Sequence, residues 1–185
     1  RFSSGRAFRI SNVFSENMSF LASSRSIIIG DDIRPEAGWN YGLNLSHCFY
    51  LFNKEGTLNL DIYKTIFEDQ IVINIEDQNE LSFTNLNGKS FANIIQIGFD
   101  YNITKNLQMR LGYKQNKSIS TFNGVEKQLP LQPEERAIIN LSYKTISDKW
   151  HLDITANYIG RSRIPNIVAD NFSPPFSLFN SQITR

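Results

Sequence analysis

The stretch WNYGLNLSHCFYLF, from Trp39 to Phe52, decides the fold. Counted from Trp39, every second residue is apolar or aromatic except His47, and the positions between them are polar or small until Tyr50. A period of two is the pattern of a β-strand with one polar and one apolar face. Strands of globular proteins usually have about 5–6 residues, whereas a tilted strand needs about 9–11 residues to cross a bilayer. The length of this run therefore favours a membrane β-barrel.

Six further segments show similar alternation and are predicted as strands. They are Thr57–Ile75, Phe91–Ile103, Leu107–Lys114, Ala137–Lys144, Trp150–Tyr158 and Phe176–Thr184. Lys64 breaks the apolar register of the first of these, so we expect a β-bulge between Lys64 and Phe67 to restore it. Residues 1–29 show no sustained period, and we expect a packed connection there with short strand pieces such as Ile27–Ile29.

The connections between the predicted strands alternate between short and long. The short ones are Asn53–Gly56, Thr104–Asn106 and Thr145–Lys149, and the long ones are Glu76–Lys89, Asn116–Arg136 and Gly160–Pro175. Outer-membrane barrels have short turns on one side of the membrane and long loops on the other. All six prolines fall between strands, where no ladder hydrogen bond is lost. Both features fit an antiparallel up-and-down barrel.

Composition is compatible with a membrane barrel and narrows the chemistry. The chain has 185 residues, enough for one domain. Its net charge of +1 creates no strong electrostatic field, so we expect no nucleic-acid partner. Its slightly negative mean hydropathy does not exclude a membrane, because lipid-facing residues alternate with polar ones in a barrel. Cys48 is the only cysteine, and we expect a buried, inert thiol. His47 and His151 lack the spacing of metal ligands, so we expect no metal site and no cofactor.

A soluble antiparallel sandwich would also show one apolar face on each strand. Its strands are usually shorter, and its loops are not short on one side only. The predicted inner faces also favour a barrel, because they carry polar residues that suit a wet or plugged lumen. These residues are Asn40, Asn44, Asn59, Asp61, Gln96, Asp100, Gln108, Arg110, Lys114, Asp153 and Asn157.

Several segments resemble, in order and spacing, the later part of the barrel of TonB-dependent outer-membrane receptors of the Bacteroidetes type. GRAFRISNVFSEN (Gly5–Asn17) resembles the family's G-x-G-[FW]-R-x-[PA]-x-x-x-E segment, with departures at Ala7 and Ser11. RPEAGWNYGLNL (Arg34–Leu45) is similar to a family entry into a barrel strand. LPLQPEER (Leu129–Arg136) resembles the L-P-x-x-P-x-H entry into another. The resemblance covers nearly the whole chain.

The resemblance implies that residues 1–185 are a partial receptor barrel domain, with about seven strands of a barrel of about 22, and that the plug domain and the final strands are absent. It implies a place in the cell outer membrane of a Gram-negative bacterium, in contact with lipid, lipopolysaccharide and the protein's own plug. The function implied is uptake, energised by the TonB complex through the plug, of a scarce extracellular ligand such as a ferric siderophore, haem, cobalamin, an oligosaccharide or a peptide. A passive outer-membrane channel and a soluble β-sandwich binding domain are the alternatives.

The chain shows no catalytic constellation, so we expect no enzyme. The adjacent acids Asp31–Asp32 and Glu134–Glu135 fall in predicted loops and are typical of solvated surface. Arg161 and Arg163 lie in a predicted long loop and are the candidate ligand-binding residues, since they could meet an anionic ligand such as a ferric chelate. The other interpretation of this pair is exposed loop cations near lipopolysaccharide phosphates.

Overall fold

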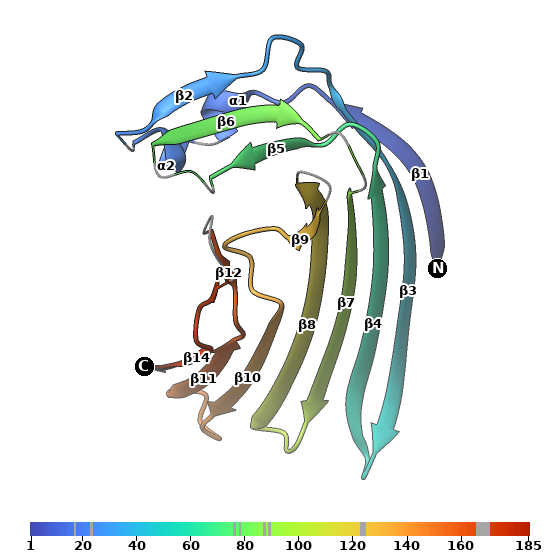
Figure 1. The fold of residues 1–185 in the computed structure, drawn as a ribbon. Helices are drawn as coiled ribbons and strands as arrows, with labels where there is room; N and C mark the ends of the chain where they lie inside the picture. The colour runs from blue at the N-terminus through green and yellow to red at the C-terminus, as the bar shows by residue number, and fades with distance from the viewer. Residues whose placement is uncertain are drawn as a thin grey trace.

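A large curved sheet and a small three-stranded sheet at one of its ends make up the fold (Figure 1). The computed structural model describes residues 1–16, 18–22, 24–75, 77, 79–86, 88, 90–122, 125–165 and 171–185. The helices in this part of the chain are short, and none is long and apolar enough to span a membrane. The structure is therefore nearly all β, as the sequence predicts.

Eight strands form the wall of the large sheet, each antiparallel to its neighbours. In spatial order they are β1 (Phe2–Arg9), β3 (Glu36–Leu51), β4 (Lys54–Phe67), β7 (Ser90–Asn102), β8 (Leu107–Phe122), β10 (Glu135–Lys144), β11 (His151–Ile159) and β14 (Phe176–Thr184). A short ninth strand, β9 (Val125–Gln128), pairs with β8. The wall curves like part of a cylinder but does not close, and β9 lies on its concave side (Figure 1). The fold is the predicted partial barrel.

The sequence pattern does not reveal the first strand of this wall. Residues 1–29 were expected to form a packed connection, yet β1 pairs with β3 along its full length. The reason lies in its outward positions, which share a face with the apolar register of β3 but have two polar residues between two phenylalanines. They are Phe2, Ser4, Arg6 and Phe8.

The predicted bulge between Lys64 and Phe67 is wrong. β4 pairs without interruption with β3 and β7 up to Phe67, and Lys64 keeps its outward position between Tyr41 and Asn93. The strand then ends, and Ile71–Asn74 forms β5 in the small sheet. The alternation continues after Phe67 because a second strand follows it.

The small sheet holds the buried core and lies beyond one end of the wall (Figure 1). Its order is β2 (Ser26–Ile29), β6 (Glu80–Asn85) and β5, with β2 parallel to β6, and the short helices α1 (Val13–Glu16) and α2 (Met18–Leu21) belong to the same region. Leu81 and Phe83 are 1% and 0% exposed. The predicted connection Glu76–Lys89, whose end residues lie outside the described part of the chain, therefore contains a core strand.

Short turns join the wall strands at the end away from the small sheet, which we call the short-turn end. The β3–β4 turn is Phe52–Asn53, with φ of 51° and 58°, rather than the predicted Asn53–Gly56. All long connections lie at the opposite long-loop end, so the predicted alternation is confirmed.

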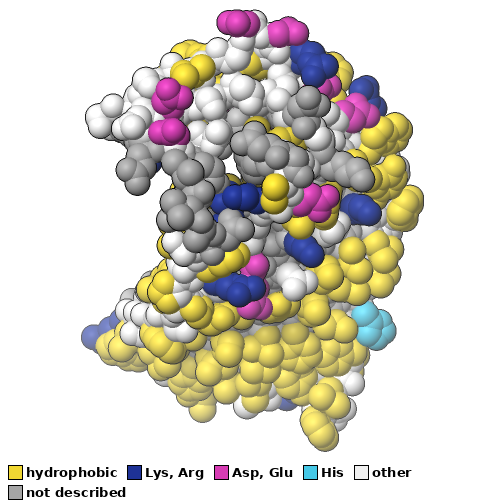
Figure 2. Space-filling view, viewed as in Figure 1, with side chains coloured by type: hydrophobic (Ala, Val, Ile, Leu, Met, Phe, Trp, Pro, Cys, Tyr) yellow, Lys and Arg dark blue, Asp and Glu magenta, His cyan; other side chains and the backbone are white. Residues whose placement is uncertain are grey.

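The two faces of the wall differ in chemistry. Trp39, Leu43 and Leu45 and the residues in register with them on the other strands form the outer face. Large hydrophobic side chains are exposed on this face. The other register forms the inner, concave face and carries the polar residues. Figure 2 shows the hydrophobic side chains as a broad band over the lower part of the molecule, with charged side chains above it and in the hollow. An exposed apolar surface of this extent is typical of contact with lipid or protein.

Candidate functional site

The inner face of the wall brings together several of the predicted polar residues. Residues that pair across neighbouring strands project from the same face. One such row crosses five strands and consists of Asn44, Asp61, Gln96, Lys114 and Arg136. From β3 to β10, the row therefore has a carboxylate near one end, on β4, and two cations at the other end, on β8 and β10.

The acidic end of the row is satisfied by its neighbours. Asn44 Nδ2 donates to Asp61 Oδ1 over 2.6 Å and to the hydroxyl oxygen of Tyr63 over 2.6 Å. Asp61 therefore has a polar partner on the wall itself. Cross-strand hydrogen bonds of the same kind link Asn40 to Thr65, Ser46 to Asn59 and Asn140 to Thr155.

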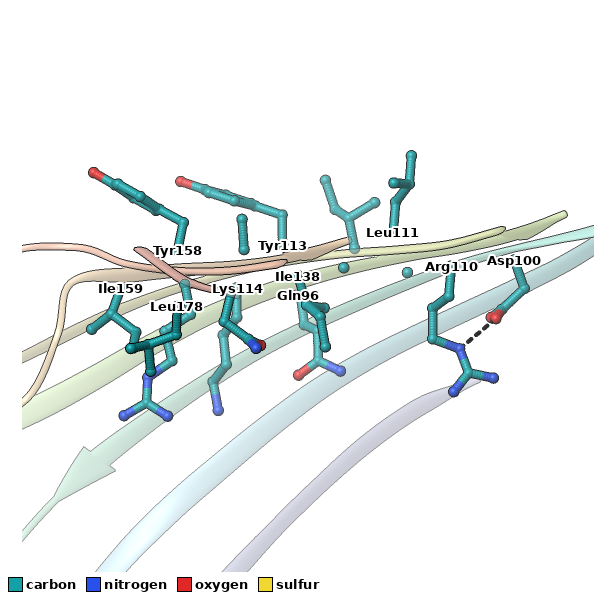
Figure 3. A pocket seen from close by; sticks show the side chains of 16 residues that line it. Gln96, Asp100, Arg110, Leu111, Tyr113, Lys114, Ile138, Tyr158, Ile159 and Leu178 are labelled. Carbon is teal, nitrogen blue, oxygen red and sulfur yellow. Dashed lines mark hydrogen bonds and ion pairs between the residues drawn. The ribbon is translucent and has the colours of Figure 1, made fainter. Parts of the chain in front are cut away.

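Asp100 and Arg110 form an ion pair two rows closer to the short-turn end. They are paired residues of β7 and β8, and Arg110 Nε lies 2.6 Å from Asp100 Oδ1 (Figure 3). Their charges therefore compensate each other on the inner face. The sequence placed both residues on this face but did not indicate that they meet.

The two cations at the other end of the row have no such partner. Lys114 and Arg136 are directly opposite each other in the β8–β10 register. Across the ranges that the structure describes, no carboxylate lies within ion-pair distance of either side chain. Like charges directly opposite each other destabilise a sheet. Figure 3 shows Lys114 on the same side of the sheet as Gln96, opposite to Tyr113.

Two adjacent hollows share these cations. The larger has a volume of about 450 Å³, and its lining also includes Ile138, Ile159 and Leu178. The smaller, of about 270 Å³, is bordered by Leu131–Pro133 from the β8–β10 connection.

Two glycines of the inner register keep the floor of the larger hollow free of side chains. They are Gly98 and Gly112, which are paired on β7 and β8. A Cβ atom at position 112 would lie 2.8 Å from Cγ2 of Ile138.

Arg161 lies in a loop, as predicted, and its charge is engaged there. Its Nε donates to Glu134 Oε2 over 2.7 Å, and its guanidinium carbon lies 4.8 Å from the ring centroid of Phe172. The hydrogen bond to Glu134 raises the pKa of Arg161. Arg161 therefore joins the β11–β14 connection to the residue before β10.

Arg163, the other predicted ligand-binding residue, is only 1% exposed. It begins the short strand β12 (Arg163–Ile164), which pairs with β13 (Asn171–Phe172). Arg163 Nε donates to the Gln128 carbonyl over 2.6 Å, and its own carbonyl accepts from Leu131 N over 2.9 Å. Arg161 and Arg163 thus hold two long connections together, and their role in ligand binding stays a prediction.

Glu36 anchors the small sheet to the wall, a role that no sequence signal indicated. Its Oε2 lies 2.5 Å from Arg9 Nε on β1, and its Oε1 accepts from Ile71 N on β5 over 2.9 Å. Nearby, Arg6 Nη2 lies 2.6 Å from Glu68 Oε2, and this hydrogen bond lowers the pKa of Glu68. One buried carboxylate and one exposed ion pair therefore fix the long-loop end.

A curved antiparallel wall with an apolar outer face, a polar inner face and short turns at one end defines a segment of a large β-barrel. The chain belongs to the TonB dependent receptor-like, beta-barrel family, whose model matches residues 1–184. Members of this family are receptors of the Gram-negative outer membrane that work with TonB and a plug domain. No curated protein matches the chain, and the Bacteroidetes type stays a prediction.

Solved structures of similar fold include a transporter and an import receptor. One is the copper transporter OprC, with a TM-score of 0.72 and 18% identity over 98% of this chain and 28% of that chain. Another is the ferric-catecholate import receptor Fiu from Escherichia coli K12 in its closed form, with a TM-score of 0.63 and 18% identity over 100% of this chain and 26% of that one. The chain spans about a quarter of either structure. Both neighbours are transporters or receptors, not enzymes.

Proposed function

We propose that this chain forms part of the barrel of an outer-membrane receptor that imports a scarce extracellular ligand with energy relayed by the TonB complex. The observation that carries the proposal is the two-faced wall, which matches the receptor family over residues 1–184. The short-turn end would then face the periplasm and the long-loop end the exterior.

The outer face supports contact with membrane lipid and lipopolysaccharide. Near the long-loop end of the outer face, Lys64, Asn93 and Lys117 form one row across β4, β7 and β8, and the last apolar row, with Ile66, Phe91 and Ile119, follows it. Lysines this close to the end of the wall suit the phosphates of lipopolysaccharide, because a cation near an anionic headgroup gains electrostatic energy.

The inner face supports contact with a plug domain. Its polar residues would be costly against lipid but suit a plugged lumen. Since the similar structures are about four times as long as this chain, we infer that the plug, the remaining strands and the contact with TonB are supplied by other parts of the receptor.

The ligand class remains broad at this level. A ferric siderophore, haem, cobalamin, an oligosaccharide or a peptide would each suit an energised receptor. The two structural neighbours handle copper and ferric catecholate, as their names state, which adds metal-containing cargo to the candidates for a first screen.

The proposal is tested by fractionating Gram-negative cells that express the full-length receptor. We expect outer-membrane location, faster gel migration of the unheated protein, and ligand uptake that stops when TonB is deleted. Uptake that continues without TonB would indicate a passive channel, and a soluble, heat-indifferent protein would refute the barrel assignment.

A further inference from the structure

We propose that the hollow around Lys114 and Arg136 binds an anionic group of the imported ligand, so that the cargo is a small anion with an apolar body. This inference rests on the proposed function and adds the ligand's charge and the residues that select it.

The first argument is charge. Asp100 is paired with Arg110, and Asp61 accepts from Asn44. Lys114 and Arg136 stand opposite each other, and among the described residues no carboxylate lies within ion-pair distance of either, since Asp100 in the lining of the same hollow is engaged by Arg110. A bound anion between two such cations would replace their repulsion with two attractive contacts, and charge-assisted hydrogen bonds are stronger than neutral ones.

The second argument is the size and lining of the hollow. Its volume of about 450 Å³ lies within the range of about 300–1,000 Å³ typical of small-molecule sites. Ile138, Ile159 and Leu178 supply apolar lining, while Gln96 and Asn157 add amides. Apolar walls with a few convergent polar groups are the usual composition of such sites.

The third argument is access from the long-loop end. The smaller hollow, which also contains Lys114 and Arg136, is bordered by Leu131–Pro133 of the β8–β10 connection. There Asn116 Nδ2 donates to Gln132 Oε1 over 3.3 Å. A ligand that enters between the long loops would therefore meet the two cations before it passes deeper along the inner face.

A carboxylate of the plug is the competing occupant. An aspartate or glutamate side chain of the plug would pair with the cations but would not use the apolar lining of Ile138, Ile159 and Leu178. The combination of two facing cations with this apolar lining therefore favours a ligand with an anionic group and an apolar body.

The test measures binding of fluorescein, an aromatic dianion, to the purified full-length receptor by fluorescence anisotropy. Rhodamine 123, which has the same xanthene ring system but carries a positive charge and an ester in place of the carboxylate, is the control probe. We expect binding of fluorescein only, weakened by salt. Lys114→Gln and Arg136→Gln should each lower its affinity by about 10- to 100-fold, and Lys114→Arg should retain most of it.

Lys117→Gln is the matched control variant, because Lys117 lies three residues further along β8 on the outer face. It should leave fluorescein binding unchanged. Faster migration of each unheated variant on a gel verifies that its barrel has formed.

Three outcomes would overturn the inference: no fluorescein binding by the wild type, equal binding of both probes, or equal losses in Lys114→Gln and Lys117→Gln. A Lys114→Gln variant with lower thermal stability but unchanged fluorescein binding would assign the cations to the plug and also overturn it. TonB-dependent uptake by cells that express the same variants separates the two proposals. Uptake without fluorescein binding refutes only this inference, whereas loss of outer-membrane location refutes both.

Discussion

The aromatic ring of Phe49 lies across Gly56, its partner in the β3–β4 register, so a Cβ atom at position 56 would be 2.4 Å from Cζ of Phe49. From this position Phe49 stacks on Phe99 and Tyr101, with centroid distances of 5.8 and 6.3 Å. The Tyr101 hydroxyl donates to the Leu51 carbonyl over 2.8 Å. A glycine therefore permits an aromatic cluster on the outer face, near the short turns, where barrels carry an aromatic girdle.

Gly56→Val should displace the Phe49 ring and destabilise the full-length receptor by about 1–3 kcal/mol, the usual cost of overpacking. Urea titration in detergent, followed by the heat-modifiable gel band, measures the change. Gly98→Ala is the control, since a Cβ there would meet no atom closer than 3.8 Å. Equal destabilisation by both variants would contradict the close fit of Phe49 over Gly56.

Arginine substitutions should distinguish the two faces of the wall. Leu43 and Ile97 lie on the outer face, with 37% and 41% of their surface exposed, so Leu43→Arg or Ile97→Arg should cost about 2–4 kcal/mol in a lipid bilayer. Asn44→Arg and Gln96→Arg, at neighbouring inner positions, should cost much less. Urea titration of the receptor in liposomes measures the free energy of unfolding of all four variants. Equal losses of stability on both registers would contradict the lipid-facing assignment.

The pair of Arg6 and Glu68 should loosen in acid. The hydrogen bond from Arg6 lowers the pKa of Glu68. The ion pair therefore stabilises the folded state above the ordinary pKa of a glutamate, and this stabilisation is lost as the pH falls through the lowered pKa of Glu68. Amide hydrogen exchange of the residues after Glu68, corrected for its intrinsic pH dependence, should rise in this range. In Glu68→Gln the extra rise should be absent, and its persistence there would assign the effect to other carboxyl groups.

Cys48 offers a direct test of which face meets water. The expectation of a buried thiol is wrong, because Cys48 is exposed on the inner face, with its Sγ 3.8 Å from Thr57 Oγ1. A charged maleimide should label Cys48 in the receptor in liposomes. It should label Leu45→Cys, placed on the outer face of a Cys48→Ser background, much more slowly. Faster labelling at position 45 would reverse the two faces.

The alternation predicted the wall strands where one register was apolar, but it failed where polar residues interrupt that register. β8 continues to Phe122, although residues from Asn116 onward were expected in a loop. Its outward Gln115 and Lys117 are polar and separate Ile119 from the apolar residues up to Tyr113, so the alternation is interrupted there. β1 was missed for the same physical reason.

The candidate site was predicted in part. The inner position of Lys114 follows from the pattern of one strand. The juxtaposition of Lys114 with Arg136 depends on the register between β8 and β10, which the strand pattern of either one does not contain. The anchoring role of Glu36 was missed because it arises from contacts between segments far apart in the chain.

The parallel pairing of β2 with β6 imposes an order on assembly. The two strands come from the connections on either side of the β3–β4 hairpin, so the small sheet forms after that hairpin has brought them together. Until then, Leu81 and Phe83 have no core to join and present an apolar, strand-forming surface. Such transient surfaces are prone to aggregate. On the proposed route to the outer membrane, this region is therefore the one that a chaperone would need to shield most.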